Sequence, residues 1–219
     1  MSTTITHWGH ACVRLERDGR RLVLDPGAFG DPAVLDDADA VLVTHEHIDH
    51  VDPARLVAAL AARPHLEVWA PAVVVDLLAE AGAPRERLHA AADGDAFTAA
   101  GFAVRALGEQ HAVVHPDLPG AANVAYLVDD AVLHPGDSLT PPPAGTSVDL
   151  LLVPVAGPWL KLSEAIDYVR AVRPRVAAPV HDAILSDRGR ALADRLVGGL
   201  GGAGEYRRIV AGEPYTLSR

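Results

Sequence analysis

The residues most able to do chemistry lie in one short segment, Thr44-His45-Glu46-His47-Ile48-Asp49-His50. It holds three imidazoles and the Asp49 carboxylate within six residues, and these are ligands that a borderline-soft divalent metal ion accepts. Burying four such side chains without partners would cost much free energy, so ordinary core packing does not explain the spacing. The segment therefore predicts a metal site.

An apolar run, Ala40-Val41-Leu42-Val43, comes directly before this segment and predicts a buried strand. Alternate residues of a strand share a side, so we expect His45, His47 and Asp49 to point the same way where the strand ends, with His50 following. A helical zinc-protease motif is excluded, because it needs a second histidine four residues after the first and residue 49 is aspartate.

Three further ligand-type residues, His111, Asp137 and His181, each follow an expected strand. Taken alone, Asp137 could be a turn residue after glycine, and His181 could be a residue that precedes a helix. Layered folds place their sites at strand ends and in the adjoining loops, where the sheet holds the ligands rigidly. The three residues together therefore favour one site built from several strands.

The chain alternates strand and helix signals, which predicts an α/β fold. We expect strands over residues 5–15, 22–24, 41–44, 66–69, 102–107, 124–127, 131–133, 150–155 and 176–180, with extended segments over 206–217. We expect helices over 53–60, 71–80, 163–172 and 187–197, with Asp52 and Ser163 as N-caps of the first and third. The run Gly198-Gly199-Leu200-Gly201-Gly202 predicts a helix stop and a flexible turn.

Composition limits the class of protein. A chain of 219 residues predicts a single domain, 1–219, with a sizeable core. Its net charge of -10 argues against general nucleic-acid binding. Cys12 is the sole cysteine, so no intramolecular disulfide forms, and we expect it to be a small core residue. We find no signal peptide at the start and no apolar run that would cross a bilayer, which predicts a cytoplasmic location.

The ordered pattern His45-x-His47-x-Asp49-His50, then His111, Gly136-Asp137 and His181, resembles the signature of the metallo-β-lactamase superfamily. Trp8-Gly9-His10-Ala11, Leu24-Asp25-Pro26 and the run 153–158 resemble its ascorbate-6-phosphate-lactonase-like branch. The resemblance implies a four-layer αβ/βα sandwich, with two mixed sheets flanked by helices and two metal ions at one edge.

The resemblance also implies a role for each ligand-type residue. One metal would be held by His45, His47 and His111, the other by Asp49, His50 and His181, and both by Asp137. His115 competes with His111, but His111 is nearer the strand end and matches the family's position. His115 would then face the pocket as a proton donor or a substrate contact.

Such a site predicts a binuclear metal-dependent hydrolase. Two divalent ions, zinc foremost with manganese or iron as alternatives, would lower the pKa of a shared water, so that a bridging hydroxide attacks a small anionic ester, lactone or phosphoester. Asp49 would bind metal and orient the nucleophile, and Asp137 resembles the lactonase, thioester-hydrolase and phosphodiesterase branches rather than the antibiotic-cleaving one. The alternatives are a phosphodiesterase for nucleotides or phospholipid head groups, a non-catalytic metal-binding regulatory or scaffold protein, and an iron-dependent redox enzyme.

Several residues keep two interpretations. His10 and Asp25 could each support a ligand, or be a core residue and a turn residue respectively. Trp159 could line the pocket or pack in the core. The remaining histidines are expected to be structural or exposed, with a pocket-edge role open for the last of them: His7, His65, His89 and His134. The substrate and the oligomeric state stay open.

Overall fold

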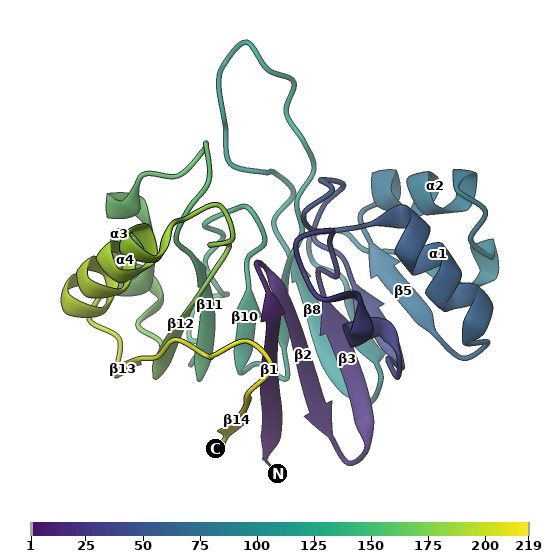
Figure 1. Ribbon diagram of the computed structural model, residues 1–219, viewed down its shortest axis with the longest axis horizontal. Coiled ribbons are helices and arrows are strands. Elements are labelled where there is room, and N and C mark those ends of the chain that lie inside the picture. Colours follow the sequence, from purple (N-terminus) through teal and green to yellow (C-terminus); the bar gives the residue numbers. More distant parts are fainter. Residues whose placement is uncertain (1, 219) are drawn as a thin grey trace.

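The computed structural model describes residues 2–218, which form two seven-stranded sheets lying face to face (Figure 1). The strands of the first sheet are β1 (Thr3–Gly9), β2 (Cys12–Arg17), β3 (Arg20–Leu24), β4 (Ala40–Leu42), β5 (Glu67–Ala70), β6 (Leu88–Ala90) and β14 (Pro214–Leu217). The strands of the second are β7 (Ala96–Ala99), β8 (Phe102–Leu107), β9 (Ala125–Val128), β10 (Val132–His134), β11 (Leu150–Pro154), β12 (Val176–Val180) and β13 (Glu205–Tyr206).

The two sheets are built to the same plan. In the order β14-β1-β2-β3-β4-β5-β6, neighbours pair antiparallel as far as β3 and parallel from there to β6. In the order β7-β8-β9-β10-β11-β12-β13, they pair antiparallel as far as β10 and parallel from there to β13. Parallel neighbours need crossover connections, which is where the long helices occur.

Each sheet carries its helices on its outer face. The first sheet is covered by α1 (Pro53–Ala62) and α2 (Ala72–Glu80), and the second by α3 (Leu162–Val172) and α4 (Asp187–Leu200). Two short 3-10 turns, η1 (Pro32–Leu35) and η2 (Arg85–Arg87), join elements of the first half. Among residues 2–218, none of the helices combines the length and the apolar character that crossing a membrane requires.

Side-chain alternation along the strands creates the layers. In β4, Leu42 packs between the sheets, whereas Val41 packs under α1 against Leu56. In β11, Leu152 faces the first sheet and Leu151 faces α3. This period of two gives each sheet two apolar faces and fixes helix, sheet, sheet and helix as successive layers. The predicted α/β four-layer sandwich of two mixed sheets is confirmed.

One predicted strand was wrong. Residues 5–15 form two antiparallel strands, β1 and β2, because the chain reverses at Gly9 and His10, where φ is +105° and +53°. The sequence signals for a tight hairpin are Asn-Gly and Asp-Gly, and Gly9-His10 is neither. The reversal puts His10 at the tip of a hairpin, at the edge of the sheet where the histidines gather.

The helix ends confirm one predicted cap and the predicted helix stop, and correct one other prediction. The Asp52 side chain accepts the N–H of Arg55, as expected of an N-cap. Ser163 is not a cap, because α3 begins at Leu162 and the Glu164 carboxylate accepts the N–H of Lys161 at 2.8 Å. The glycine run ends α4 as predicted: the helix includes Gly198 and Gly199, ends at Leu200 and has Gly201 as its C-cap. A Cβ atom at Gly198 would lie 3.1 Å from the ring of Tyr206, so glycine lets the helix and β13 approach closely.

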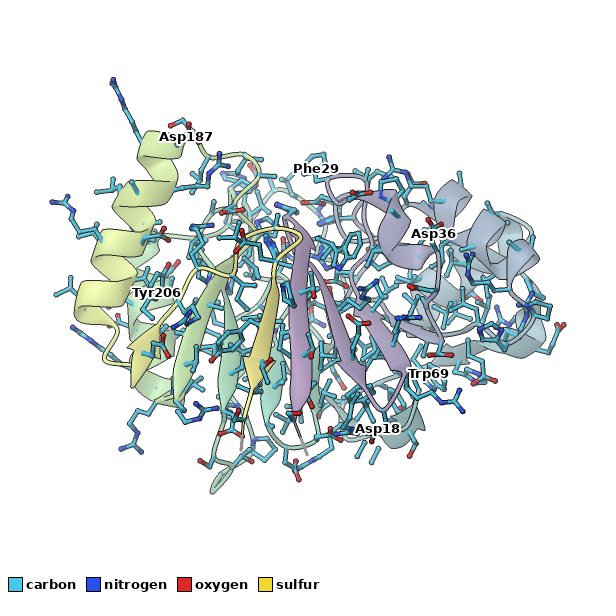
Figure 2. The ribbon with its side chains drawn as sticks, turned by 60° about the horizontal axis from the view of Figure 1, so that its bottom comes forward. Asp18, Phe29, Asp36, Trp69, Asp187 and Tyr206 are labelled. Carbon is cyan, nitrogen blue, oxygen red and sulfur yellow. The ribbon has the colours of Figure 1, made fainter. Side chains whose placement is uncertain are left out.

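The loops after β4, β8, β10 and β12 meet at one edge of the sandwich. A long loop between β8 and β9 rises above this edge, and the chain ends lie on the opposite side (Figure 1). Phe29 lies near this edge, and the Asp18 turn lies at the other one (Figure 2).

Candidate metal centre

The segment that carries the densest ligand pattern is a loop and not the end of a strand. β4 ends at Leu42, and the carbonyl of His47 accepts the N–H groups of His50 and Val51 at 2.9 Å each. The expectation that Asp49 shares a side with His45 and His47 was wrong, because strand alternation stops before these residues. The turn instead directs Asp49 and His50 to a different cluster.

The ligand-type side chains form two clusters, and within each the candidate ligand atoms lie within 4.8 Å of one another. The open cluster, named for its exposed His47, consists of His45, His47, His111 and Asp137. The closed cluster consists of His10, Asp49, His50 and His181. The structure thus brings together all seven residues that the sequence suggested as metal ligands.

Asp137 stands between the two clusters. Its Oδ2 lies 3.3 Å from Nε2 of His111 in the open cluster. Its Oδ1 lies 3.0 Å from Nε2 of His50 and 3.1 Å from Nε2 of His181 in the closed cluster. The carboxylate is nearly buried, and its two oxygens point to different sides.

Within the two clusters, four buried ligand-type atoms have no partner with hydrogen-bond geometry among residues 2–218. They are the Nε2 atoms of His50, His111 and His181 and the Oδ1 atom of Asp137. Buried polar atoms of a folded protein are normally paired, so an unpaired group of them needs an explanation. Imidazole nitrogens and carboxylate oxygens are the donor set of zinc and related divalent ions, and these residues therefore fit such a metal.

Hydrogen bonds at the opposite ring nitrogens fix which atom each histidine presents. Nδ1 of His181 donates to the carbonyl of Ala156 at 2.7 Å, and Nδ1 of His111 donates to the carbonyl of Ala112. A carbonyl only accepts, so Nδ1 carries a proton in both rings, and Nε2 is the atom left to bind a metal once it is deprotonated. Both rings therefore direct Nε2 toward the clusters.

Asp25 accepts hydrogen bonds that hold the segment 44–50 in place. Its buried carboxylate accepts the backbone N–H and the hydroxyl of Thr44 at 2.8 Å each, and Nδ1–H of His50 at 2.8 Å. The Thr44 oxygen in turn lies 3.0 Å from Nδ1 of His45. One buried carboxylate thus holds a ligand of each cluster, so Asp25 supports the site rather than merely ending a strand.

His10 holds Asp49. Its Nδ1 accepts the N–H of Ala183 at 3.3 Å, so Nε2 carries the proton and donates to Oδ2 of Asp49 at 3.0 Å. The ring also packs on that of His181, with 4.0 Å between centroids. Since Nε2 is engaged as a donor, we assign His10 to orienting Asp49.

Trp159 and Asn123 fix Asp137. The Trp159 indole N–H donates to Oδ2 of Asp137 at 2.8 Å, and the Asn123 amide oxygen accepts its backbone N–H at 3.0 Å. Gly136, with φ +61°, permits this approach, because a Cβ atom there would lie 2.4 Å from the Asn123 oxygen. Sequence reasoning missed Asn123, and the glycine before Asp137 was the available signal.

The remaining histidines have structural contacts. His7 is buried and its Nε2 donates to the carbonyl of His10, while His134 is buried and its Nε2 donates to the carbonyl of Ala11. His134 therefore lies in the interior and not at a pocket edge. His65 is exposed, and His89 stacks on Trp69 with 4.6 Å between ring centroids.

The clusters differ in electrostatics. Burial lowers the pKa of His50, but the Asp25 and Asp137 carboxylates outweigh it and raise that pKa to about 10. Burial likewise lowers the pKa of His181, but the nearby Asp137 and Asp49 carboxylates outweigh it and raise that pKa to about 9. In the open cluster, burial is the main cause that lowers the pKa values of His45 and His47. Without a metal, the closed cluster holds protons at neutral pH and His45 and His47 do not.

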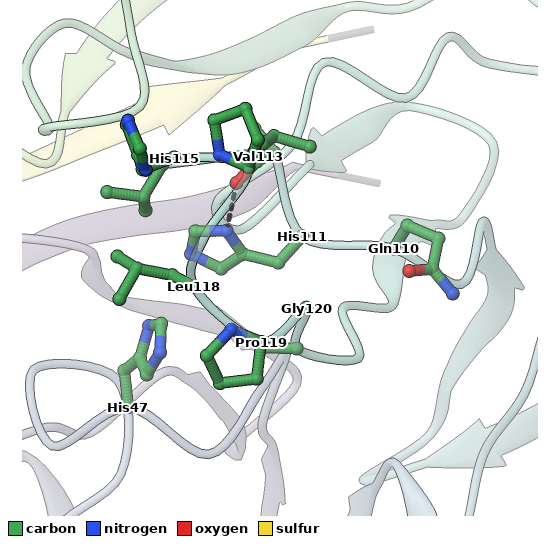
Figure 3. Close-up of a pocket in the computed structure, with 12 residues that line it drawn as sticks. His47, Gln110, His111, Val113, His115, Leu118, Pro119 and Gly120 are labelled. Atoms are coloured by element: carbon green, nitrogen blue, oxygen red, sulfur yellow. Dashed lines mark hydrogen bonds between the residues drawn. The ribbon is translucent and has the colours of Figure 1, made fainter.

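A cavity of about 580 Å³ opens beside the open cluster (Figure 3). It lies between His47, His111 and the loop 110–121, and His115 lines it from the loop. The His115 side chain is exposed, and its Nδ1 accepts the N–H of Asp117 at 3.2 Å. The geometry thus groups His111 with the other ligand-type residues and leaves His115 in the cavity wall.

Two face-to-face mixed sheets, with a histidine and aspartate centre where their loops meet, define the metallo-β-lactamase class of fold. The family described as "Beta-lactamase superfamily domain" matches residues 4–181, and the chain belongs to this family.

Relatives agree with this assignment. Protein Rv0786c of Mycobacterium tuberculosis is 40% identical over 86% of this chain and 88% of its own length. A protein of Aeropyrum pernix named UPF0173 metal-dependent hydrolase is 28% identical over 81% of each chain. The structure of Igni18, described as a novel metallo hydrolase from Ignicoccus hospitalis, covers 100% of both chains with a TM-score of 0.75 and 21% identity, which shows the fold alone. These names do not specify the lactonase-like branch, which stays a prediction.

Proposed function

We propose that this protein is a hydrolase of small molecules that uses two divalent metal ions. One observation carries the proposal: four buried ligand-type atoms without partners lie in two clusters that share Asp137. Buried carboxylates and imidazoles this close need positive charge between them, which divalent ions would supply when bound and protons on His50 and His181 supply in the metal-free protein. The Aeropyrum relative's name, metal-dependent hydrolase, supports the same conclusion.

The ligand assignment follows the two clusters. We propose that one ion is held by His45, His47 and His111, the other by Asp49, His50 and His181, and both by Asp137. Zinc suits this donor set best, with manganese and iron as alternatives. When bound, two such ions lower the pKa of a water molecule and polarise a carbonyl or phosphoryl oxygen.

The chain's own residues would position the reactants. Asp49 receives the His10 N–H at Oδ2, which leaves Oδ1 to accept a hydrogen bond from the attacking water. His115 accepts at Nδ1, so its Nε2–H can donate a hydrogen bond to the leaving-group oxygen of a substrate in the cavity. We propose that Asp49 positions the water and His115 contacts the leaving group, beside the shared carboxylate of Asp137.

The test is a metal count on protein purified without added metal, followed by a panel of ester, lactone and phosphodiester substrates. We expect about two equivalents per chain and metal-dependent hydrolysis, and in His47→Ala loss of the open-cluster ion and of the hydrolysis. His65→Ala is the matched control, because His65 is exposed and belongs to neither cluster, and it should keep both properties.

Other results would change the proposal. A metal-loaded protein that hydrolyses none of the panel would favour the regulatory or scaffold alternative. Bound iron with oxygen-dependent turnover would favour a redox enzyme. A protein that binds no zinc, manganese or iron would contradict the ligand assignment itself.

A further inference from the structure

The cavity beside the metal centre lies on one side of it. His47 and His111 of the open cluster line its wall, whereas His50, His181 and Asp49 of the closed cluster do not. A substrate whose reactive group sits between the clusters would therefore extend the rest of its structure toward the loop 110–121. The chemistry of this loop then selects the substrate.

The wall that faces the cavity is apolar. Val113, Val114 and Leu118 line it with side chains that are 73%, 38% and 56% exposed. Figure 3 shows Val113, Leu118 and Pro119 around the opening above His47. Several exposed apolar side chains around one concave surface are typical of a site that binds an apolar group.

The cavity wall lacks the positive charge that would attract an anionic substrate. None of the described residues that line the cavity is lysine or arginine, and the polar side chains beyond the two metal-centre histidines are Gln110 and His115. The chain as a whole carries a net charge of -10, so the surroundings do not attract anions. A second negative group, distant from the metal ions, would have no cation to meet here.

The other side of the centre is apolar as well. Phe29 is 48% exposed and its ring lies 5.2 Å from that of His10. Ile48, between His47 and Asp49, is 55% exposed, and its carbonyl accepts the N–H of Ala28 beside Phe29. Exposed apolar side chains thus flank both clusters, and the cavity lies on the His47 side.

We infer that the substrate is an uncharged ester or lactone that carries an apolar group next to the scissile bond, and that this group binds between His47 and the loop 110–121. The inference rests on the proposed function and narrows its substrate class. It excludes the anionic substrates that the sequence had suggested. Val113 and Leu118 are its specificity-determining residues.

The experiment uses alkyl hydroxamates, whose head group chelates zinc and whose chain can enter the cavity. Binding of acetyl, butyryl, hexanoyl and octanoyl hydroxamate to the zinc-loaded protein is measured by calorimetry. We expect the affinity to rise about threefold to fourfold for each methylene group that the cavity buries. A chain of the same length ending in a carboxylate should lose this gain.

Two variants with similarly exposed side chains provide the comparison. Leu118→Asp places a charge in the cavity wall and should flatten the dependence on chain length. Val210→Asp should keep it, because Val210 is 53% exposed and does not line the cavity. Both side chains are at the surface, so neither change disturbs the core.

The outcomes separate the inference from the proposed function. Suppose that the protein binds zinc but its affinity for the hydroxamates does not depend on their chain length, or that this dependence persists in Leu118→Asp. Either result overturns the inference and leaves the hydrolase proposal intact. Failure to load zinc, manganese or iron overturns the proposed function, and the inference with it. A steeper gain for the carboxylate-ended chain would return the substrate to the anionic class.

Discussion

The open and closed clusters contain the same kinds of side chain but differ in what surrounds them. In the open cluster His47 is exposed and faces a cavity. In the closed cluster His50 and His181 are buried, and His10 packs against His181 and bonds to Asp49. Under the proposed function, we expect the closed side to anchor a metal ion and the open side to meet the substrate.

Both clusters also join the two sheets. His45, His47, Asp49 and His50 follow β4 of the first sheet, whereas His111 and His181 follow β8 and β12 of the second. Ligands from both sheets mean that a bound ion ties the halves of the sandwich together. Metal binding should therefore raise the stability of the whole fold by mass action.

Asp137→Asn should have the largest effect, because it removes the charge that both clusters share. We expect metal affinity to fall by more than about 100-fold, beyond the range usual for groups that only support a ligand. Metal content after dialysis and the melting temperature with and without chelator would measure this. Asp130→Asn is the control, since Asp130 is an exposed hairpin residue. Loss of only one equivalent would contradict a shared role.

Asp25→Asn should act on the closed cluster more than on the open one. An asparagine oxygen cannot replace both carboxylate oxygens, which serve the backbone and hydroxyl groups of Thr44 and Nδ1 of His50. We expect the affinity of the closed cluster for its metal ion to fall about 10-fold to 100-fold, and the affinity of the open cluster to fall less. A titration resolved into two steps would show this, and equal weakening of both steps would contradict it.

The clusters should also respond differently to pH. The pKa values of His50 and His181, about 10 and about 9 without metal, exceed the unfolded value of 6.5. They therefore stabilise the metal-free protein fully below about pH 6.5, and this stabilisation is lost as the pH rises through 9 and 10. A metal ion must displace these protons, so its affinity for the closed cluster should rise by up to about tenfold per pH unit and proton.

Two measurements test this linkage. Chemical denaturation of the chelated protein between pH 6 and pH 10 should show falling stability, and calorimetry in buffers of different ionisation enthalpy should show proton release. The open cluster should bind with little release, because burial keeps His45 and His47 neutral at pH 7. Metal binding without proton release at either step would contradict the assignment of the raised pKa values.

The sequence predicted the parts of this site that depend on residue type and order. The ligand-type residues were found because several of them within a few positions have no ordinary structural role, and the fold followed from apolar runs and the family resemblance. The roles of Asp25 and Trp159 were not predictable, because each acts through a residue distant in the chain: His50 and Asp137. Contacts over such separations depend on how the sheets pack.

The errors came from backbone geometry. Strand alternation was extended past Leu42 into a loop, because a pattern of polar residues does not show where hydrogen-bonded pairing ends. The hairpin at Gly9 and His10 was missed because histidine seldom adopts positive φ. Because the hairpin was missed, the contact between His10 and Asp49 was not predicted either. A residue in the middle of a strand could not reach the loop after β4.

His10 provides the finest test of the closed cluster, because its change should alter turnover and leave metal content in place. His10→Phe removes the N–H that Oδ2 of Asp49 accepts and keeps a ring against His181. We expect turnover on the best substrate to fall about tenfold, at the low end for a group that supports a ligand, with KM nearly constant. His10→Gln restores an N–H donor and should recover part of the loss. Equal losses in both variants, or loss of one metal ion, would show that His10 packs or ligates rather than orients Asp49.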